Sequence, residues 1–300
     1  MSKPNHRIIV LGPLRSGTSL TAELVRLWGA YAGRKDELWQ SDPNDRRGYG
    51  YMEYIPLQQL NDDLLDNNDR VPPPAGLMAE KASDPKYRDQ AIHLLNLMDQ
   101  QTLENGAPAW VWKDARLPLS LRFWSDFWDE PIYVVTVRHP AETILSAART
   151  EGVDEENAPF SAGLIYWQYC MLNILTFTQS SRRKIFVSYD ALTDNPREEC
   201  VRLSRFLDEQ CGRSSGDAQQ RMEAMLSQIS EGQRHFRYGK SLAEMEQTTQ
   251  EQRALYDFLR VKTIYPDEAF SRDDFELYPG WREYLQAMDM LLALSQRQET

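Results

Sequence analysis

The chain has 300 residues, a length that suits one large α/β domain or two smaller ones and can enclose a sizeable core. Its 34 basic and 45 acidic side chains give a formal net charge of −11. This balance argues against a nucleic-acid partner, because proteins that bind nucleic acids normally carry a basic face. Hydrophobic residues make up 41% of the chain, a globular composition that excludes a mainly disordered protein.

The three cysteines form no CxxC pair, which argues against a disulfide scaffold or a structural zinc site and favours a reducing compartment. Near the amino terminus, the apolar run from Ile8 to Leu11 is too short for the core of a secretion signal. No apolar stretch approaches the roughly 18 residues that a membrane span requires. We therefore expect a cytoplasmic protein without a membrane span.

In chain order, short apolar runs rich in β-branched or aromatic residues alternate with segments of helical periodicity. The apolar runs predict buried strands at residues 7–11, 110–112, 132–137 and 184–188. The periodic segments predict helices at residues 18–28, 54–65, 91–103 and 157–180, after residue 140, and from residue 196. This alternation predicts βαβ units, and hence an α/β fold with a mainly parallel central sheet.

Two further segments bear on the domain organisation. Residues 71–85 contain three consecutive prolines and are predicted to form a surface loop or short linker. From about residue 212 the chain is polar, rich in Gln and Glu, and helical in pattern. We interpret residues 1–300 as a single domain, in which residues 1–211 form the α/β core and residues 212–300 add a helical decoration or lid.

The segment after the first predicted strand has the pattern of a phosphate-binding loop. It runs from Gly12 through Arg15 and Gly17 to Thr18 and Ser19, and a helix follows. Backbone N–H groups at such a turn cradle anions together with the helix dipole. Thr18 stands where loops that bind ATP or GTP for hydrolysis have a lysine, which argues against those reactions. Arg15 supplies a cation inside the loop. The alternative is a glycine-rich turn that binds no ligand.

A second anion site is predicted at the end of the third strand. Arg138 lies at the carboxyl end of that strand, where open parallel sheets bind ligands. Ser146 follows eight positions later in the next helix, so its hydroxyl can point back to an anion held by Arg138. The pair suits one phosphate monoester, distinct from the ligand of the first loop. The alternative is an arginine paired with a helix carboxylate and a serine that faces solvent.

Together the two motifs resemble those of the sulfotransferases that use PAPS (3′-phosphoadenosine 5′-phosphosulfate). In that family a loop of the type RSGT[ST] binds the 5′-phosphosulfate and an R-x7-S element binds the 3′-phosphate. The resemblance covers most of the first 210 or so residues. Four further segments match family patterns in the same order, namely Gly48–Glu53, Leu60–Asp62, Trp112–Arg116 and Val187–Pro196. The sequence departs from the family at Leu14 and at Ala115, which replaces the usual proline, and neither change removes a functional group.

The resemblance implies a P-loop-type three-layer α/β/α fold with added helices and the transfer of a sulfuryl group from PAPS to an acceptor. Arg15 and Lys113 are implied as cations beside the transferring group. No metal is implied, since sulfuryl transfer lacks the multiply charged phosphate that requires Mg²⁺ in kinases. The residues implied in PAPS binding are Arg15, Ser16, Gly17, Thr18, Ser19, Arg138 and Ser146.

A hydroxyl acceptor needs a base near its proton, and relatives use a glutamate or a histidine. We assign this role to Glu53, which falls in the family's GYxE pattern; its alternative role is a solvated carboxylate at the start of a helix. Glu37, 22 residues after Arg15, is the second candidate. His93 is expected to be structural, and His139 to touch the 3′-phosphate or only to shape its turn.

The sequence leaves the acceptor and two other functions open. Aromatic residues within 31–75 and 150–180 suit a carbohydrate or a small molecule, and for most of them core packing is the stronger expectation. A basic cluster at residues 234–240 is predicted to close over the cofactor or to be solvated. The competing functions are a nucleotide-dependent kinase with a degenerate phosphate loop and a non-catalytic nucleotide-binding module. Sequence does not give the oligomeric state.

Overall fold

Four strands form one parallel sheet at the centre of the structure. The computed structural model describes residues 6–39, 50–66, 71–74, 76–213, 216–229, 238–239 and 241–264. Within these ranges the strands are β1 (His6–Leu11), β2 (Ala109–Lys113), β3 (Ile132–Val137) and β4 (Lys184–Ser188). They lie in the order β2-β1-β3-β4, and each neighbouring pair is parallel. The predicted strands and their parallel arrangement are confirmed.

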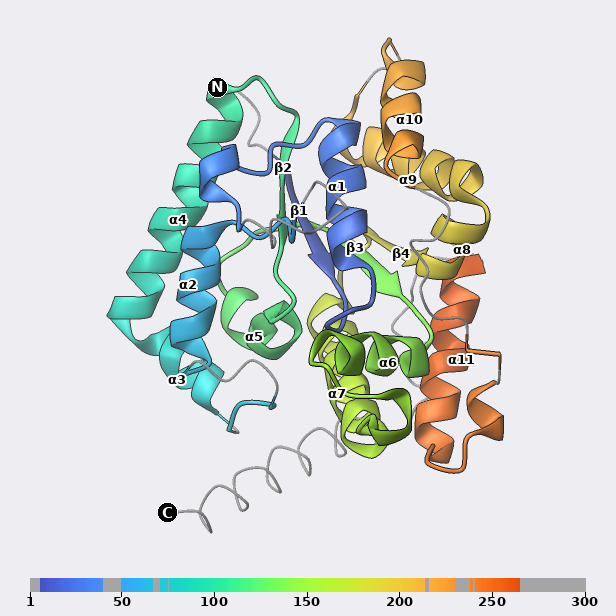
Figure 1. The fold of residues 1–300 in the computed structure, drawn as a ribbon. Helices are drawn as coiled ribbons and strands as arrows, with labels where there is room; N and C mark the ends of the chain where they lie inside the picture. The colour runs from blue at the N-terminus through green and yellow to red at the C-terminus, as the bar shows by residue number, and fades with distance from the viewer. Residues whose placement is uncertain are drawn as a thin grey trace.

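Each face of the sheet is covered by its own layer of helices (Figure 1). Ile8 and Val10 point into one core cluster, while Ile9 and Leu11 point into the other. The first face is covered by α1 (Thr18–Trp28), α8 (Tyr189–Asp194), α9 (Pro196–Cys211) and α10 (Ala218–Ser227). The second face is covered by α2 (Ile55–Leu64), α3 (Leu77–Ser83), α4 (Pro85–Glu104), α5 (Leu117–Trp124), α7 (Phe160–Thr178) and α11 (Gln250–Ile264). The three-layer α/β/α fold is therefore confirmed.

Strands β2 and β3 are mostly apolar because both of their faces are covered. All six residues of β3 and all five of β2 are buried. A strand covered on one side only would alternate apolar with polar residues. Helix α6 (Pro140–Thr150) follows β3 and packs against α7. Short 3₁₀ turns complete the described elements at Lys35–Glu37, Glu155–Asn157 and Leu242–Glu244.

The segment predicted as a loop at residues 71–85 contains helix α3, so that prediction is wrong for Leu77–Ser83. Gly76, in the left-handed conformation at φ 84°, allows the turn into this helix. Met78 packs in the core cluster of the second face, and the Lys81 ammonium donates to the carbonyls of Asp63 and Leu64 at the end of α2. Sequence periodicity misses the helix because only two turns are present and their contacts are tertiary.

The chain beyond residue 212 contributes to both helical layers. Helix α10 packs against α1 and α9. Helix α11 packs against β3, β4 and α7, and buries Leu255, Tyr256 and Leu259 in the core of the second face. The helical pattern predicted for this region is present in both elements. Its description as a decoration or lid on a core of residues 1–211 stays a prediction.

Candidate active site

The carboxyl ends of the four strands meet at one edge of the sheet and bring the predicted site residues together. Val10 is paired with Lys113, so the end of β2 lies beside the loop that follows β1. Val137, just before Arg138, is paired with Ser188 at the end of β4. Segments that are far apart in sequence therefore supply one site, as expected for an open parallel sheet.

The predicted phosphate loop joins β1 to α1 and is tied to β3. The Ser16 hydroxyl lies 3.0 Å from that of Thr136, which itself donates to the Leu11 carbonyl at 3.1 Å. The Ser16 amide donates to the Pro13 carbonyl at 3.1 Å. Both polar groups of Ser16 thus hold the shape of the loop. A Cβ added to Gly12 would lie 2.2 Å from the Thr136 hydroxyl oxygen, so only glycine fits there.

Gly17 gives helix α1 a left-handed N-terminal cap at φ 100°. A Cβ added at this position would lie 2.2 Å from the Tyr189 ring, which packs against the loop from the end of β4. Thr18 and Ser19 then begin the helix, and its first i→i−4 bond runs from Thr21 N–H to the Gly17 carbonyl. The first-turn amides before Thr21 have no intrahelical acceptor, and the positive end of the helix dipole lies with them.

Arg15 links the loop to helix α6. Its backbone has a φ of 67°, unusual for a residue with a side chain. Its Nε donates to the Ser146 hydroxyl at 3.1 Å, and its carbonyl accepts from Arg138 Nη1 at 3.0 Å. The two motifs predicted from sequence are therefore in direct contact, with Arg15 touching both members of the second one.

Arg138 is buried and partnered by protein groups. Its Nε donates to Glu142 Oε2 at 3.2 Å, and its guanidinium lies 4.4 Å from the centre of the Tyr189 ring. Glu142 is itself buried and also accepts from the Tyr238 amide at 3.1 Å. The pairing with a helix carboxylate, foreseen as the alternative role of Arg138, is present. It uses one of five guanidinium N–H groups and the Arg15 carbonyl uses another, so three remain for an anion.

Lys113 and Glu53 form a buried ion pair. Lys113 Nζ lies 2.6 Å from Glu53 Oε1, and the two side chains are 2% and 12% exposed. The Ala115 amide also approaches Glu53 Oε1, at 3.4 Å. Proline, the usual family residue at position 115, has no N–H, so this departure adds a donor to the carboxylate.

The other candidate bases lie elsewhere. Glu37 pairs with Arg34 at 2.9 Å and accepts from Gln101 at 3.5 Å. His93 is exposed on α4.

His139 caps the start of α6 and is buried, with its ring 5.5 Å from that of Tyr238 and 5.1 Å from that of Tyr256. Of the two glutamates, Glu53 is the one in contact with a predicted cationic site residue.

A buried polar network behind Lys113 was not predicted as functional from sequence. Asp114 accepts from Arg116 Nε at 2.8 Å and from Asn61 Nδ2 at 2.8 Å. Arg116 also contacts Asp62, and its Nη2 lies 3.7 Å from Glu53 Oε2. Burial lowers the pKa of Arg116, but the attraction of Asp114, Glu53 and Asp62 more than offsets this and raises it above the ordinary value. The sequence signal for this network is the WKDAR pattern together with Asn61 and Asp62 of LND.

Local sequence offered a signal for Glu142 as well, because this acidic residue lies in the first turn of α6, only four positions after Arg138. For Tyr189, the sequence gives only its position after the fourth strand, and its contact with Gly17 requires the fold. The basic cluster predicted at residues 234–240 falls outside the described residues, except for Tyr238 and Gly239. Tyr49, one of the aromatic residues proposed for the acceptor pocket, also falls outside them.

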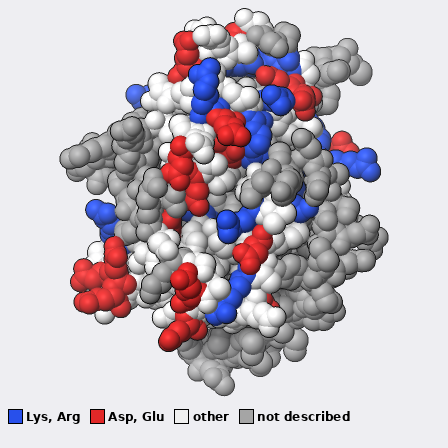
Figure 2. Space-filling model, turned by 90° about the vertical axis from the view of Figure 1, so that its right-hand side faces the viewer, with Lys and Arg blue, Asp and Glu red and all other residues white. Residues whose placement is uncertain are grey.

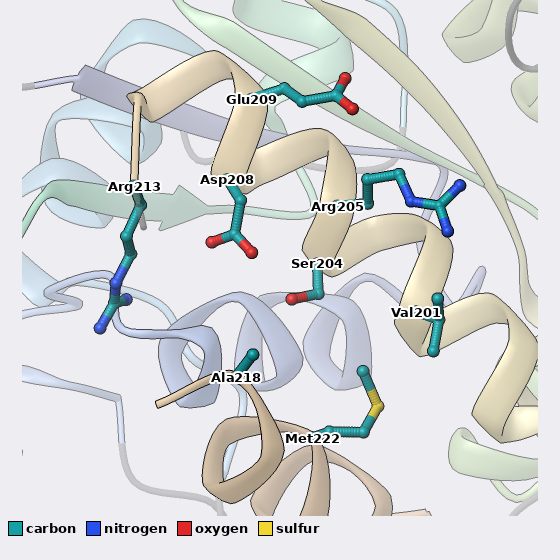
Figure 3. Close-up of a pocket in the computed structure, with 8 residues that line it drawn as sticks. All are labelled: Val201, Ser204, Arg205, Asp208, Glu209, Arg213, Ala218 and Met222. Carbon is teal, nitrogen blue, oxygen red and sulfur yellow. The ribbon is translucent and has the colours of Figure 1, made fainter. Parts of the chain in front are cut away.

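One hollow lies beside the site and a larger one lies away from it. One of about 90 Å³ borders the loop at Pro13 and Leu14, and lies between α6 and α7, with Trp167 in its wall. A larger one of about 450 Å³ lies between α9 and α10, near Arg213 (Figure 3). Arg213 binds the carbonyl of Trp28 at the far end of α1, roughly 16 Å along the helix from the phosphate loop. The larger hollow is therefore separate from the site.

The surface charge, the possible metal ligands and the apolar helices bear on what the protein can bind. On the face in Figure 2, Lys and Arg side chains are interspersed with Asp and Glu over the coloured surface. Within the described ranges, no group of three His, Cys, Asp or Glu side chains is placed to hold a metal ion. None of the helices described is both long and apolar enough to cross a membrane.

Comparisons with known proteins identify the family of the chain. Similar solved structures include the sulfotransferase domain of the Synechococcus PCC 7002 olefin synthase (20% identity, TM-score 0.47, 92% of this chain and 94% of that one) and the sulfotransferase domain of the curacin biosynthetic pathway (20%, 0.42, 98% and 98%). A sulfotransferase from Mycobacterium tuberculosis H37Rv is also similar (15%, 0.41, 86% and 76%). No curated protein sequence gives a match. A model of the sulfotransferase family matches residues 7–212, from β1 to the end of α9. The chain therefore belongs to the sulfotransferase family.

Proposed function

We propose that this member of the sulfotransferase family transfers a sulfuryl group from PAPS to a hydroxyl or amine of a carbohydrate or small molecule. The observation that carries the proposal is the contact of Arg15 with both Arg138 and Ser146. It joins a phosphate loop that lacks the lysine of ATP-hydrolysing enzymes to a second anion site. Two adjacent anion sites suit a nucleotide with phosphate groups on two different ribose carbons.

The residues present fit such a ligand. The glycine at position 12 keeps the loop backbone close to β3, and Gly17 starts α1 without a side chain over its first-turn amides. These amides, with Thr18 and Ser19, would hold the 5′-phosphosulfate. Arg138, with its remaining N–H groups, and Ser146 would hold the 3′-phosphate. The buried Glu142 neutralises part of the Arg138 charge, so a bound phosphate adds to an ion pair rather than meeting an isolated cation.

When bound, PAPS supplies the sulfuryl group, and its bisphosphate portion is the leaving group. Arg15 and Lys113 are the cations that we place at the transferring group, where loss of one preorganised donor commonly costs about 10²–10³ in rate. Arginine suits the bridging position because its planar fork grips two oxygens and stays charged. We assign the acceptor's proton to the Glu53 carboxylate, which is the acidic group in contact with Lys113.

The proposed acceptor class rests on the aromatic residues near the site. Of the aromatic residues within 31–75 and 150–180, Tyr54, Trp167 and Tyr169 are buried in the core. Trp39 is 47% exposed. The small hollow beside Pro13 is open to a modest apolar group. A carbohydrate or small molecule therefore stays the proposal, as does the cytoplasmic location inferred from the cysteines.

The test is a calorimetric titration of adenosine 3′,5′-bisphosphate into the metal-free protein, with Arg138→Ala and Arg138→Lys alongside. We expect binding in the wild type and a loss of about 1.5–3 kcal/mol in Arg138→Ala, the usual value for a hydrogen bond to a charged group. Arg138→Lys keeps the charge opposite Glu142 and lacks the fork, so it reports on ligand geometry if the alanine variant does not fold. Arg205→Ala, on the exposed side of α9, is the control and should bind as the wild type.

The titration, together with a turnover assay, decides between the competing functions. Binding of ATP with Mg²⁺ in preference to the bisphosphate would contradict the proposal and favour a kinase. Bisphosphate binding without release of bisphosphate from PAPS, across an acceptor screen of sugars, phenols and amines, would favour a non-catalytic nucleotide-binding module.

A further inference from the structure

The Glu53 carboxylate lies between two cations that differ in how firmly they are held. Lys113 Nζ lies 2.6 Å from Oε1, and Arg116 Nη2 lies 3.7 Å from Oε2. Each cation therefore faces a different oxygen of the same carboxylate. Lys113 comes from the end of β2, whereas Arg116 is the residue that caps α5.

Arg116 is fixed in place. Its Nε and Nη2 donate to the two oxygens of Asp114, at 2.8 and 3.1 Å, and its Nη1 contacts Asp62. A planar guanidinium with this many partners has a single orientation. The buried Asp114 is held in turn by Asn61 Nδ2 at 2.8 Å.

Asn61 anchors this network to α5. Its Oδ1 accepts from the Ser120 hydroxyl at 3.0 Å and from Trp124 Nε1 at 2.7 Å. Asn61, Ser120 and Trp124 are all fully buried. Hydrogen bonds join α5 to Asn61, Asn61 to Asp114 and Asp114 to Arg116, the arrangement that rigidifies a polar network. The last step, from Arg116 to Glu53, is an ion-pair contact at 3.7 Å.

Lys113 is held more loosely. Glu53 Oε1 is its hydrogen-bond partner within the described part of the chain, which uses one of three ammonium N–H groups. A lysine side chain carries its charge on a flexible stem, so it can turn away from Glu53 toward a neighbouring anion. If Arg116 were absent, that movement would leave a buried carboxylate without a cation, which is strongly unfavourable.

We propose that Arg116 is a positioning residue that holds Glu53 in place while Lys113 turns to the transferring group. Departure of Lys113 also frees Glu53 Oε1 to accept the acceptor's proton. The Asp114 and Asn61 side chains serve by keeping Arg116 at this position. This inference rests on the proposed role of Lys113 beside the transferring group, and it predicts an energetic coupling between Lys113 and Arg116 through Glu53.

A double-mutant cycle on thermal stability at pH 8 measures this coupling without an acceptor. Lys113→Met is introduced into the wild type and into a variant carrying Arg116→Gln with Asp114→Asn, which removes one buried charge of each sign. We expect Lys113→Met to lower Tm by roughly 2 °C in the wild type and by roughly 8 °C in the neutralised background. Equal losses in the two backgrounds would overturn the proposal, because Arg116 would then not support Glu53.

The control cycle uses an exposed ion pair at the C-terminal end of α5. Arg122 and Asp126 form an exposed ion pair at 3.0 Å, with side chains 46% and 47% exposed. In a background with Arg122→Gln and Asp126→Asn, Lys113→Met should lower Tm by as much as it does in the wild type. If the neutralised Arg116 background does not fold, Arg116→Lys replaces it. One ammonium group cannot hold both oxygens of Asp114 and also face Glu53. Lys113→Met should therefore lower Tm by more in the Arg116→Lys background than in the wild type.

The coupling can be judged apart from the proposed function. If the wild type fails to bind adenosine 3′,5′-bisphosphate, the proposed function is contradicted while the cycle still reports on Arg116. If bisphosphate binds, Arg116→Lys should keep its Kd within about twofold and, with an acceptor from the screen, lower kcat while leaving KM for PAPS unchanged. A purely structural arginine would instead lower the amount of folded enzyme and leave kcat per folded molecule unchanged.

Discussion

The Nε of Arg15 donates to the hydroxyl of Ser146 at 3.1 Å, across 131 positions of sequence. The two sequence motifs predict that these residues bind different phosphate groups. Their contact places helix α6 directly against the phosphate loop, and the bond from Arg138 to the Arg15 carbonyl makes the same connection through the backbone. A ligand that engages one anion site is thus adjacent to the residues of the other.

Ser146→Ala is expected to weaken adenosine 3′,5′-bisphosphate binding by about 1–1.5 kcal/mol, or roughly five- to tenfold in Kd. The variant loses a hydroxyl proposed to contact the 3′-phosphate and also the acceptor that orients Arg15. Calorimetry measures the effect. Ser125→Ala, whose exposed hydroxyl donates only to the Arg122 carbonyl among the bonds described, should bind as the wild type. An unchanged Kd in Ser146→Ala would remove this serine from the anion site.

Gly17→Ala is expected to lower the free energy of unfolding by about 1–3 kcal/mol and to reduce bisphosphate binding. The new Cβ would meet the Tyr189 ring at 2.2 Å, at a φ of 100° that disfavours any side chain. Gly106→Ala is the matched control, since its φ is 64° and nothing lies within 4 Å of the added Cβ. It isolates the cost of the backbone conformation, about 1 kcal/mol. Denaturant unfolding of both variants gives the comparison, and equal losses would mean that the Tyr189 contact is unimportant.

Glu53→Gln is expected to reduce kcat for sulfuryl transfer by about 10²–10⁴, the range for loss of a general base, while the bisphosphate Kd stays within about twofold. Glu37→Gln should leave kcat near the wild-type value, since Glu37 is occupied by Arg34 and Gln101. Turnover is followed as bisphosphate released from PAPS with an acceptor from the screen. Loss of kcat in the Glu37 variant alone would reverse the assignment of the base.

Much of this site follows from local sequence because parallel strands end at a common edge. The apolar runs located β1 and β3, so the positions of Arg15 and Arg138 at that edge could be predicted. The loop's use of Arg15 in place of a lysine at Thr18 was also readable. These features depend on residues adjacent in sequence to a strand end, where the fold class fixes the position.

The contacts that complete the site depend on tertiary packing. Glu53 reaches Lys113 across 60 positions, from a segment held by an antiparallel bridge between Leu38 and Tyr54. Hydrophobic periodicity does not predict a contact between two segments so far apart in the sequence. Similarly, the bond between the Ser16 and Thr136 hydroxyls depends on the loop lying against β3, and the role of Ser16 in PAPS binding stays a prediction.

A partly buried lysine lies at the opposite edge of the sheet. Lys184, at the start of β4, donates to the Thr178 carbonyl at 2.6 Å. Burial, and then the charge of Lys262, lower its pKa from 10.5 to about 7. Between these two values the unfolded chain binds a proton that the folded protein does not, so the free energy of unfolding rises with pH in this window.

The difference in unfolding free energy between the wild type and Lys184→Met isolates this contribution, because other titrating groups cancel. We expect the wild type to gain about 1.4 kcal/mol per pH unit relative to the variant between pH 8 and 10, and the difference to level off below pH 7, where both states are protonated. Lys86→Met, at an exposed position of α4, provides the reference series. Urea unfolding across pH 6–10 measures both. If the difference in unfolding free energy between the wild type and Lys184→Met does not change from pH 8 to 10, the Lys184 ammonium stays charged in the folded protein. The space between β4 and α11 would then be better solvated than its burial implies.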